Sequence, residues 1–435
     1  MDVAVWTGII LFGLFFLFLF IGVPIAVSIA AATFAAALLI LSVDASLLAV
    51  SQQLITGVDS TVLLALVFFM LAGSIMNNGG IALRLINLAK LMGGRMAGSL
   101  AHTNIIGNTL FGAISGSAIA AAASMGRIMH PQQEKEGYSS SYSAAVNIAS
   151  APTGLIIPPS GMPIIYSLLT GGTSIGALFI AGYLPGLLMV GLLIIVAYIL
   201  AKRAKYPVAD KTGGGEAVKI IWQAVPSLFL IVIVIGGIAG GIFTATEGAA
   251  VAVFYALLLC LIYRSLSLSD FPKILKETVS YSGIILLLIG ASTAMSWVLA
   301  YAEIPQSITN AMLSATDNTI ILLLIMLLIL LVVGTFMDVA PALLIFTPIM
   351  FPVATEMGLH PVHFGMIMAM ALAIGVTTPP IGTVLFIGSS VSKVPIEKII
   401  PKLMMFYVPL VAALVLVAFI PEISLFLPRL FGLVE

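Results

Sequence analysis

Two stretches of this chain place hydroxyl groups, glycines and one carboxylate within otherwise apolar surroundings. The first is Ser115 to Ser117, in NTLFGAISGSAIAAAASMG, and the second is Gly334 to Asp338, in LVVGTFMDVAPALLIFTPIMFP. Hydroxyl, carbonyl and carboxylate oxygens are the ligands that hard cations prefer. Ser117 and Asp338 are also residue types that begin helices well. Each stretch is therefore predicted to be the tip of a re-entrant hairpin, with the second arm starting at the Ser or the Asp.

A pair of prolines follows each predicted tip. Residues 154–161 read GLIIPPSG and residues 375–382 read GVTTPPIG, the same frame displaced by 375 − 154 = 221 positions. Proline removes a backbone hydrogen bond and interrupts a helix. A single proline kink is common in membrane helices, because neighbouring groups satisfy the freed backbone. Two interruptions in matched frames instead favour a repeated architecture with one broken helix in each half.

Broken helices at the bilayer midplane bind substrates and coupling ions in secondary transporters, through helix ends and freed carbonyls. We therefore predict two Na⁺ sites, one at each hairpin tip, with the substrate between the tips. The predicted ligands of the first ion are Ser115, Gly116, Ser117, Thr153 and Gly154, those of the second ion are Gly334, Thr335, Asp338, Gly375, Thr377 and Thr378, and those of the substrate are Ser115, Ser117 and Asn108. The alternative for Asp338 is a helix cap without a transported partner.

The composition places these features in a membrane. Hydrophobic residues make up 61% of the chain and charged residues 8%, against about 25% charged in soluble proteins. Apolar stretches near the ~20 residues needed to cross a bilayer as a helix indicate an all-α polytopic fold; they include Val3–Phe20, Val23–Leu41, Leu178–Leu200, Ile221–Ile242 and Ile284–Leu299. The 17 basic and 17 acidic residues balance, so no nucleic-acid partner is expected.

The distribution of charge predicts the orientation in the membrane. Residues 84–95 and 264–276 contain clustered Lys and Arg, whereas residues 44–59 and 303–317 contain only acidic charges. The positive-inside rule places the basic loops in the cytoplasm, which puts both termini on the periplasmic side and gives five crossings in each half. At a displacement of 221, each basic loop corresponds to an acidic loop of the other half. Equivalent loops are therefore expected on opposite sides of the membrane. The sequence therefore predicts an inverted repeat.

Several other motifs bear on function. The chain has no G-x-x-x-x-G-K-[ST] sequence for ATP and no H-E-x-x-H sequence for a protease. Thr244 and Glu247 have the spacing of a capping box. The stretches DASLLAVSQQLITG and LSLSDFPKILKETV are amphipathic and are expected to lie along the membrane faces. No Lys or Arg lies at the predicted tips, so helix N-termini and hydroxyl donors would hold an anionic substrate, and a neutral one would fit the same groups.

The motifs resemble the large membrane subunit of tripartite ATP-independent periplasmic (TRAP) transporters, the DctM family. The resemblance rests on FGAISGSAIAAAASMG, SAPTGLIIPPSG, IFTATEGAAVAVFYAL, GTFMDVAPALLIFTPIMFPV and GVTTPPIGTVLF, and it spans nearly the whole chain. It implies a transporter rather than an enzyme, driving sodium-coupled uptake of an organic acid across the bacterial inner membrane. The implied partners are a four-helix small subunit of the DctQ type, a periplasmic binding protein and the lipid bilayer.

The resemblance also implies an elevator mechanism, in which a transport domain moves against a fixed scaffold. The expected division is a scaffold with an amphipathic arm (1–96), a transport segment with the first hairpin and broken helix (97–205), a linker and second scaffold segment (206–317), and a second transport segment (318–435). Among family substrates the sequence looks most similar to the sialic acid (N-acetylneuraminate) members, and C4-dicarboxylates are the alternative.

Two other classes of membrane protein remain open at this stage. A subunit of a proton-translocating or redox complex would use the helix breaks for a proton path. Such proteins bury several ionisable residues at the midplane, whereas this chain offers Asp338 nearly alone. A passive channel would carry flux without a partner protein or an ion gradient.

Overall fold

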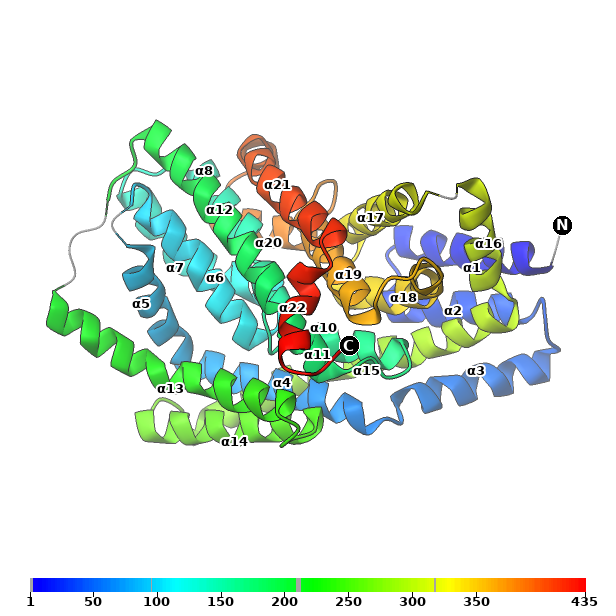
Figure 1. Ribbon diagram of the computed structural model, residues 1–435. Helices are drawn as coiled ribbons and strands as arrows, with labels where there is room; N and C mark the ends of the chain where they lie inside the picture. Colours follow the sequence, from blue (N-terminus) through cyan, green and yellow to red (C-terminus); the bar gives the residue numbers. More distant parts are fainter. Residues whose placement is uncertain (1–2, 95, 209–212, 317) are drawn as a thin grey trace.

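The computed structural model describes residues 3–94, 96–208, 213–316 and 318–435, which form helices joined by short connections (Figure 1). Arg95 and Asp317, which end two of the charged loops above, lie outside the described residues, as do linker residues 209–212. The helices are α1 (Val3–Phe20), α2 (Ile25–Ala37), α3 (Val43–Val58), α4 (Thr61–Asn78), α5 (Ile81–Gly93), α6 (Ser99–Ser115), α7 (Ala118–Lys135), α8 (Ser140–Ser150), α9 (Thr153–Ile156), α10 (Met162–Leu169), α11 (Ile175–Ala181), α12 (Tyr183–Ala204), α13 (Gly214–Ala239), α14 (Ala245–Tyr263), η1 (Leu268–Asp270), α15 (Phe271–Tyr301), α16 (Ile304–Ala315), α17 (Thr319–Phe336), α18 (Val339–Glu356), α19 (Pro361–Gly375), α20 (Thr383–Ser392), α21 (Ile396–Phe419) and α22 (Glu422–Leu430).

The predicted all-α membrane fold is confirmed. Among the described residues, eight helices are long and apolar enough to cross a membrane. They are α4, α11 with α12, α13, α14, η1 with α15, α17, α18 and α21. The capping box also forms, because the Thr244 hydroxyl accepts from Glu247 N at 3.2 Å and the Glu247 carboxylate accepts from Thr244 N at 2.8 Å. This box begins α14.

The helices of the two halves follow the same order at a displacement near 221. Helix α7 begins at Ala118 and α18 at Val339 (339 − 118 = 221), and α10 begins at Met162 and α20 at Thr383 (383 − 162 = 221). The contacts repeat as well: α7 packs against α20 and α18 against α10, while α4 packs against α14 and α15 against α2. The second arm of each hairpin thus contacts the helix that follows the prolines of the other half. The opposite orientation of the halves in the membrane remains a prediction.

Two elements differ from the sequence expectation. The stretch Val23–Leu41 is helical only over Ile25–Ala37, because residues 38–41 form turns before Ser42 caps the next helix. The two amphipathic stretches also differ from each other. The first is a separate helix, α3, with a bend at Asp59 and Ser60 before α4, whereas the second continues into the single 31-residue helix α15. No Pro, Asp or Asn interrupts the second half at the corresponding position.

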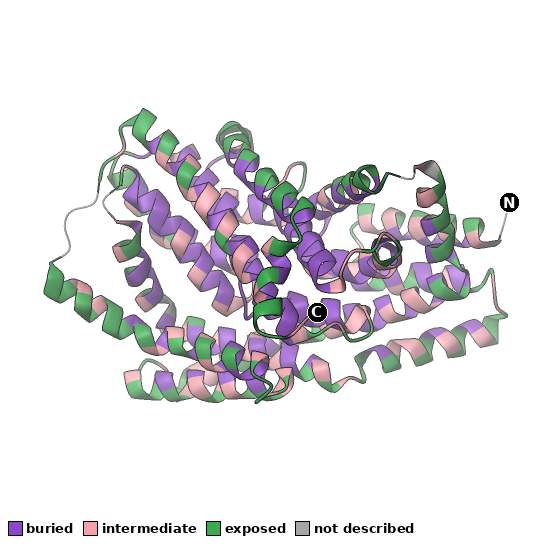
Figure 2. Cartoon of the chain, viewed as in Figure 1, coloured by how far each residue is buried: buried purple, intermediate pink, exposed green. Residues whose placement is uncertain are grey.

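The helices form a long layer and a second group packed upon it (Figure 1). Helices α13, α14, α4, α15 and α3 contact one another along the lower edge of this view, and α6, α7, α8, α12, α20 and α21 lie above them. The helices that precede the prolines are the most enclosed: every residue of α19 from Val362 to Gly375 is buried, as are Tyr142 to Ser150 of α8 (Figure 2). A helix buried on all sides has no polar face, so the periodicity of α19 carries no amphipathic signal.

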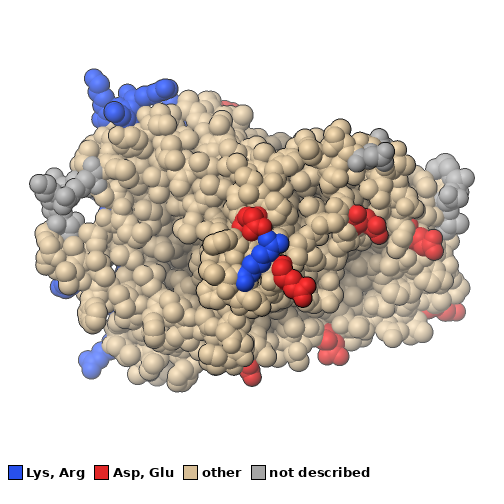
Figure 3. Space-filling model, viewed as in Figure 1, with Lys and Arg blue, Asp and Glu red and all other residues tan. Residues whose placement is uncertain are grey.

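Charged side chains are separated on the face shown in Figure 3. Most basic residues visible there lie at the left end, and acidic residues lie toward the centre and right. On α22, Arg429 pairs with Glu422. This separation fits an orientation set by the positive-inside rule, which itself remains a prediction.

Candidate functional site

The first hairpin turns at the residues predicted. Helix α6 ends at Ser115, Gly116 adopts the left-handed conformation (φ +63°), and Ser117 begins α7 by accepting a hydrogen bond from Ala120 N at 3.2 Å. A positive φ favours glycine at the middle position. The tip therefore reverses the chain in three residues, with a hydroxyl on each side of the glycine.

The second hairpin turns in a similar way, with a carboxylate in place of the hydroxyl cap. Helix α17 ends at Phe336, and Asp338 Oδ1 accepts from Val339 N at 2.9 Å where α18 begins. The predicted caps at both tips are confirmed. Because the cap uses one carboxylate oxygen of the half-buried Asp338, the other is left for a further partner.

Each hairpin crosses the broken helix of its own half at a pair of glycines. A Cβ atom at Gly154 would lie 2.2 Å from Gly112 Cα, and one at Gly375 would lie 2.5 Å from Gly334 Cα. Small residues allow helix backbones to approach this closely in membranes. The two backbones therefore touch directly: Gly112, three residues before Ser115, lies on Gly154, and Gly334 lies on Gly375. That the members of either predicted set meet at one ion remains a prediction.

The helices break after these crossings. Residues 157–161 separate α9 from α10, residues 376–382 separate α19 from α20, and the Pro158–Pro159 and Pro379–Pro380 peptide bonds are both cis. In the second half, Gly382 N donates to Thr335 O at 2.8 Å, which joins the segment after the prolines to the hairpin. The predicted broken helices are therefore present in both halves.

Four threonine hydroxyls near the crossings have each given their single proton to a backbone carbonyl, so they can only accept from, or bind, a further partner. Each donates its proton to a carbonyl three or four residues earlier in the chain: Thr153 to Ser150 (2.7 Å), Thr335 to Val332 (2.7 Å), Thr377 to Ile374 (2.7 Å) and Thr378 to Ile374 (2.9 Å). A hydroxyl has one proton and two lone pairs, so each oxygen keeps lone pairs for a further partner. The Thr377 carbonyl is itself occupied, because the Tyr407 hydroxyl donates to it at 2.5 Å. Such oxygen lone pairs suit a cation.

Asn108, a predicted substrate ligand, lies deeper in the protein than the first hairpin tip. The substrate was predicted to reach its amide, but Asn108 is fully buried between α6 and α8, and its Nδ2 faces Asn147 and Ser150. The spacing of seven residues to Ser115 places it about two helical turns below the tip. Asn108 is thus further from the turn than Ser115 and Ser117, and its assignment to the substrate remains a prediction.

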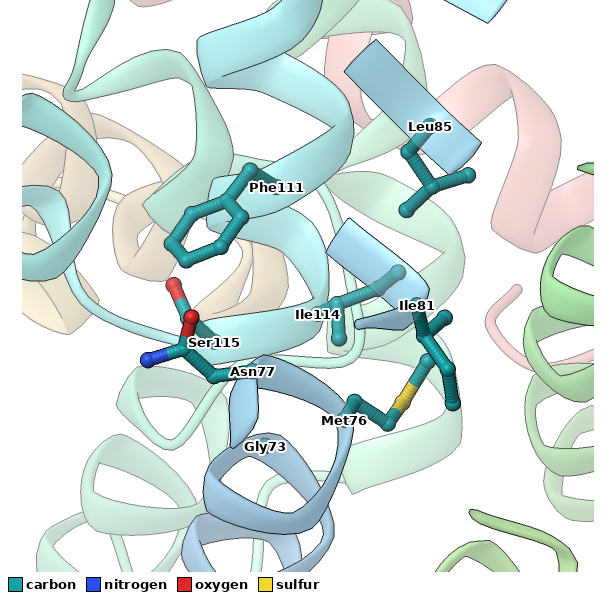
Figure 4. Close-up of a pocket in the computed structure, with 8 residues that line it drawn as sticks. All are labelled: Gly73, Met76, Asn77, Ile81, Leu85, Phe111, Ile114 and Ser115. Atoms are coloured by element: carbon teal, nitrogen blue, oxygen red, sulfur yellow. The ribbon is translucent and has the colours of Figure 1, made fainter. Parts of the chain in front are cut away.

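A small pocket lies beside the first tip, between α4, α5 and α6 (Figure 4). It is lined by Gly73, Met76, Asn77, Ile81, Leu85, Phe111, Ile114 and Ser115. Figure 4 shows the Asn77 amide and the Ser115 side chain on the same side, apart from Ile81 and Leu85. Asn77 is not among the predicted site residues, and its only signal in the sequence is a pair of amides, Asn77 and Asn78, at the end of an apolar span.

Comparison with known proteins identifies the family. A family model described as the DctM component of the tripartite ATP-independent periplasmic transporter matches residues 12–423. The chain belongs to this family. As a TRAP large subunit it is a multi-pass membrane permease, and the hairpins and broken helices described above are features of this permease.

The relatives of this TRAP large subunit have different substrates in their names. A Salmonella typhimurium protein, the uncharacterized YgiK, is 50% identical over 98% of each chain. The sialic acid TRAP large permease SiaM of Vibrio cholerae is 38% identical, covering 95% of this chain and 96% of its own. The C4-dicarboxylate large permease DctM of Rhodobacter capsulatus is 33% identical, covering 98% and 100%. Each match spans almost the full length, so the helices that carry the predicted sites lie within the matched length.

The similar solved structures support the fold of this chain and carry no argument about its function. The Alcanivorax borkumensis YdaH transporter superposes with a TM-score of 0.61 at 15% identity, covering 85% of this chain and 86% of that one. Neisseria gonorrhoeae MtrF gives 0.57 at 14% identity, covering 86% and 85%. The TRAP large subunit thus shares its arrangement of helices with these two transporters.

Proposed function

We propose that this TRAP large subunit takes up N-acetylneuraminate across the bacterial inner membrane, driven by Na⁺. The observation that carries the proposal is the pair of equivalent crossings, Gly112 on Gly154 and Gly334 on Gly375, each beside a helix break and a capped hairpin tip. Two equivalent oxygen-lined positions suit the binding of at least two ions. The implied partners are a small membrane subunit and a periplasmic binding protein.

The sodium assignment rests on the chemistry of the proposed ligands. The first set offers the Ser115 and Ser117 hydroxyls with Thr153, and the second offers Thr335 and the Asp338 carboxylate, together with the backbone carbonyls around each crossing. These are oxygen ligands suited to a hard cation. Among the described residues, no group of three or more His, Cys, Asp or Glu side chains could hold a transition metal.

The substrate is proposed from the relatives. The sialic acid permease of Vibrio cholerae is 38% identical, but a Pseudomonas aeruginosa C4-dicarboxylate permease is 37% identical over 85% of this chain. Because the two sequence identities, 38% and 37%, are so close, C4-dicarboxylate uptake is the second candidate. Both substrates are carboxylates, and hydroxyl donors and helix N-termini at the tips can bind either.

The mechanism we propose is an elevator, in which the hairpins and broken helices move past a scaffold that includes α4. The contact between them is close, because a Cβ atom at Gly73 of α4 would lie 3.1 Å from Ile114 O and 3.4 Å from Ser115 Cα. Gly73 therefore lies directly against the first tip. A bulkier side chain there would meet the backbone of the moving hairpin.

Gly73→Val is expected to slow uptake at least about tenfold while Na⁺ binding persists. Overpacking costs about 1–3 kcal/mol, and about 1.4 kcal/mol added to a barrier slows a step tenfold. The measurements are the initial uptake rate and the Na⁺-dependent shift in thermal midpoint. Gly236→Val on α13 is the control, because no atom lies within 4 Å of a Cβ there. Normal uptake by Gly73→Val would show that this contact does not change during transport.

The proposed function is tested by uptake into proteoliposomes containing this chain, the small subunit and the binding protein. Labelled N-acetylneuraminate is expected to accumulate under an inward Na⁺ gradient, and not under a proton gradient alone or without the binding protein. Uptake of labelled succinate in its place would move the assignment to C4-dicarboxylates. Uptake on a proton gradient alone would contradict the sodium sites, and flux needing neither gradient nor binding protein would indicate a channel.

A further inference from the structure

A tyrosine of α21 contacts the broken helix of the second half. The Tyr407 hydroxyl donates to Thr377 O at 2.5 Å; Tyr407 is 9% exposed and Thr377 is fully buried. Thr377 lies in residues 376–382, the segment that separates α19 from α20. The proposed second ion site uses the same segment, through Thr377 and Thr378. Tyr407 is not among the predicted ligands.

The Tyr407 hydroxyl takes part in the hydrogen bonding of the carbonyls at this break. Three successive carbonyls each accept from one donor: Gly375 from Thr378 N at 2.8 Å, Val376 from Val384 N at 3.0 Å, and Thr377 from the Tyr407 hydroxyl. The next carbonyl, Thr378 O, accepts from no N–H or O–H group in the part of the chain that the structure describes. Thr378 O therefore keeps both lone pairs for a cation.

This free carbonyl lies near the second hairpin. A Cβ atom at Gly382 would lie 2.8 Å from Thr378 O, and Gly382 N donates to Thr335 O at 2.8 Å. Gly382 therefore approaches a carbonyl of the break and a carbonyl of the hairpin. Thr378 is half-buried, whereas Thr377 is fully buried. Of the two threonines, Thr378 is thus the one that an ion can reach.

The first half forms its break without a tyrosine hydroxyl. At a displacement of 221, Gly186 of α12 takes the place of Tyr407. Gly186 is buried, and a Cβ atom there would lie 2.3 Å from Ile157 Cγ1, so α12 packs directly against the first break. Ile156 takes the place of Thr377, and its carbonyl accepts from no N–H or O–H group among the described residues. A break of this kind can therefore form without the hydroxyl bond.

We propose that Tyr407 is a positioning residue for the second Na⁺. Its hydroxyl holds Thr377 O away from the ion and fixes the segment so that Thr378 O is the carbonyl ligand. Without the hydroxyl, Thr377 O would be buried with no partner, which is costly, and the segment would rearrange. Groups that fix the orientation of a metal ligand raise metal affinity. This inference rests on the proposed sodium coupling.

The two proposed ion sites then differ in their chemistry. The second combines the Asp338 carboxylate with a carbonyl that a tyrosine positions, whereas the first has only neutral groups and no equivalent tyrosine. A change at Tyr407 should therefore affect one of the two ions and leave the other unchanged.

The test is equilibrium binding of ²²Na⁺ to the purified complex with the small subunit, in choline-balanced buffer. Tyr407→Phe is expected to bind the wild-type number of ions, one of them about tenfold more weakly. The control is Tyr166→Phe, which removes a buried hydroxyl that donates to Pro361 O at 2.8 Å, at the other end of α19. The control should have the wild-type Na⁺ affinities.

A hydroxyl with only a structural role would give a different pattern. Tyr407→Phe would then lower the thermal midpoint in the absence of Na⁺ but bind ²²Na⁺ as the wild type does. That pattern overturns the positioning role and leaves sodium coupling intact. A wild type that binds no Na⁺ overturns sodium coupling as well.

Gly382→Ala provides a second variant, should Tyr407→Phe fail to fold. The new Cβ atom would lie 2.8 Å from Thr378 O, so this carbonyl must move, and one Na⁺ should again bind about tenfold more weakly. The control is Gly358→Ala, because Gly358 also has a positive φ but no atom lies within 4 Å of a Cβ there. Wild-type Na⁺ binding by Gly382→Ala would show that Thr378 O is not a ligand.

Discussion

Gly154→Ala is expected to abolish most uptake, with a loss of at least about tenfold. The new Cβ atom would lie 2.2 Å from Gly112 Cα, 2.6 Å from Gly112 C and 2.9 Å from Ala113 N, and all three are backbone atoms. No rotation of a side chain relieves these contacts, so the hairpin and the broken helix must separate. Overpacking of this kind costs about 1–3 kcal/mol. It would also displace the ion ligands proposed near the crossing, where small shifts matter most.

The equivalent change in the second half provides an internal comparison. A Cβ atom at Gly375 would lie 2.5 Å from Gly334 Cα and 2.8 Å from Gly334 C, so Gly375→Ala should cause a similar loss. Gly191→Ala on α12 is the control, because no atom lies within 4 Å of its Cβ and alanine favours the helix. The measurements are Na⁺-driven uptake and the amount of folded protein. Wild-type uptake by Gly154→Ala would show that the close crossing is not needed for the site.

The parts of the site that depend on short-range chemistry could be predicted from the sequence. Ser117 and Asp338 cap the second arms of the hairpins because their side chains accept hydrogen bonds from the first backbone N–H groups of a helix. The proline pairs break the helices for an equally local reason. The family resemblance supplied the rest of the expected function, and the family is confirmed.

Features that depend on contacts between distant segments could not be predicted. The glycine crossings bring residues about forty positions apart into contact; Gly154, Gly334 and Gly375 are among the predicted ion ligands, but nothing in the sequence predicts that Gly112 meets Gly154 or how closely the backbones approach. The rotation of α6, which turns the Asn108 side chain toward Asn147 of α8, is another such feature. The positions of Gly73 and Asn77 beside the hairpin could not be predicted, because α4 contacts the hairpin only in the folded protein.

Asp338→Asn is expected to raise the Na⁺ concentration needed for half-maximal uptake at least about tenfold. Asparagine caps a helix about as well as aspartate, so α18 should still begin at the same residue, and the change removes only the charge. Two unit charges 4 Å apart interact by about 4 kcal/mol at an effective dielectric constant near 20, and about 1.4 kcal/mol corresponds to a tenfold change in affinity. The measurement is Na⁺ titration of initial uptake rates at saturating substrate.

The matched control is Asp59→Asn, which removes an exposed carboxylate at the end of α3. The Na⁺ titration of this variant should match that of the wild type. Asp338→Ala separates the two roles of the residue, because it loses the cap as well as the charge and should reduce thermal stability by a further ~1 kcal/mol. A wild-type Na⁺ titration in Asp338→Asn, together with a stability loss in Asp338→Ala, would leave Asp338 as a helix cap only. The second ion site would then have to rest on Thr335, Thr377 and Thr378 with the nearby carbonyls, a neutral set of ligands like the first.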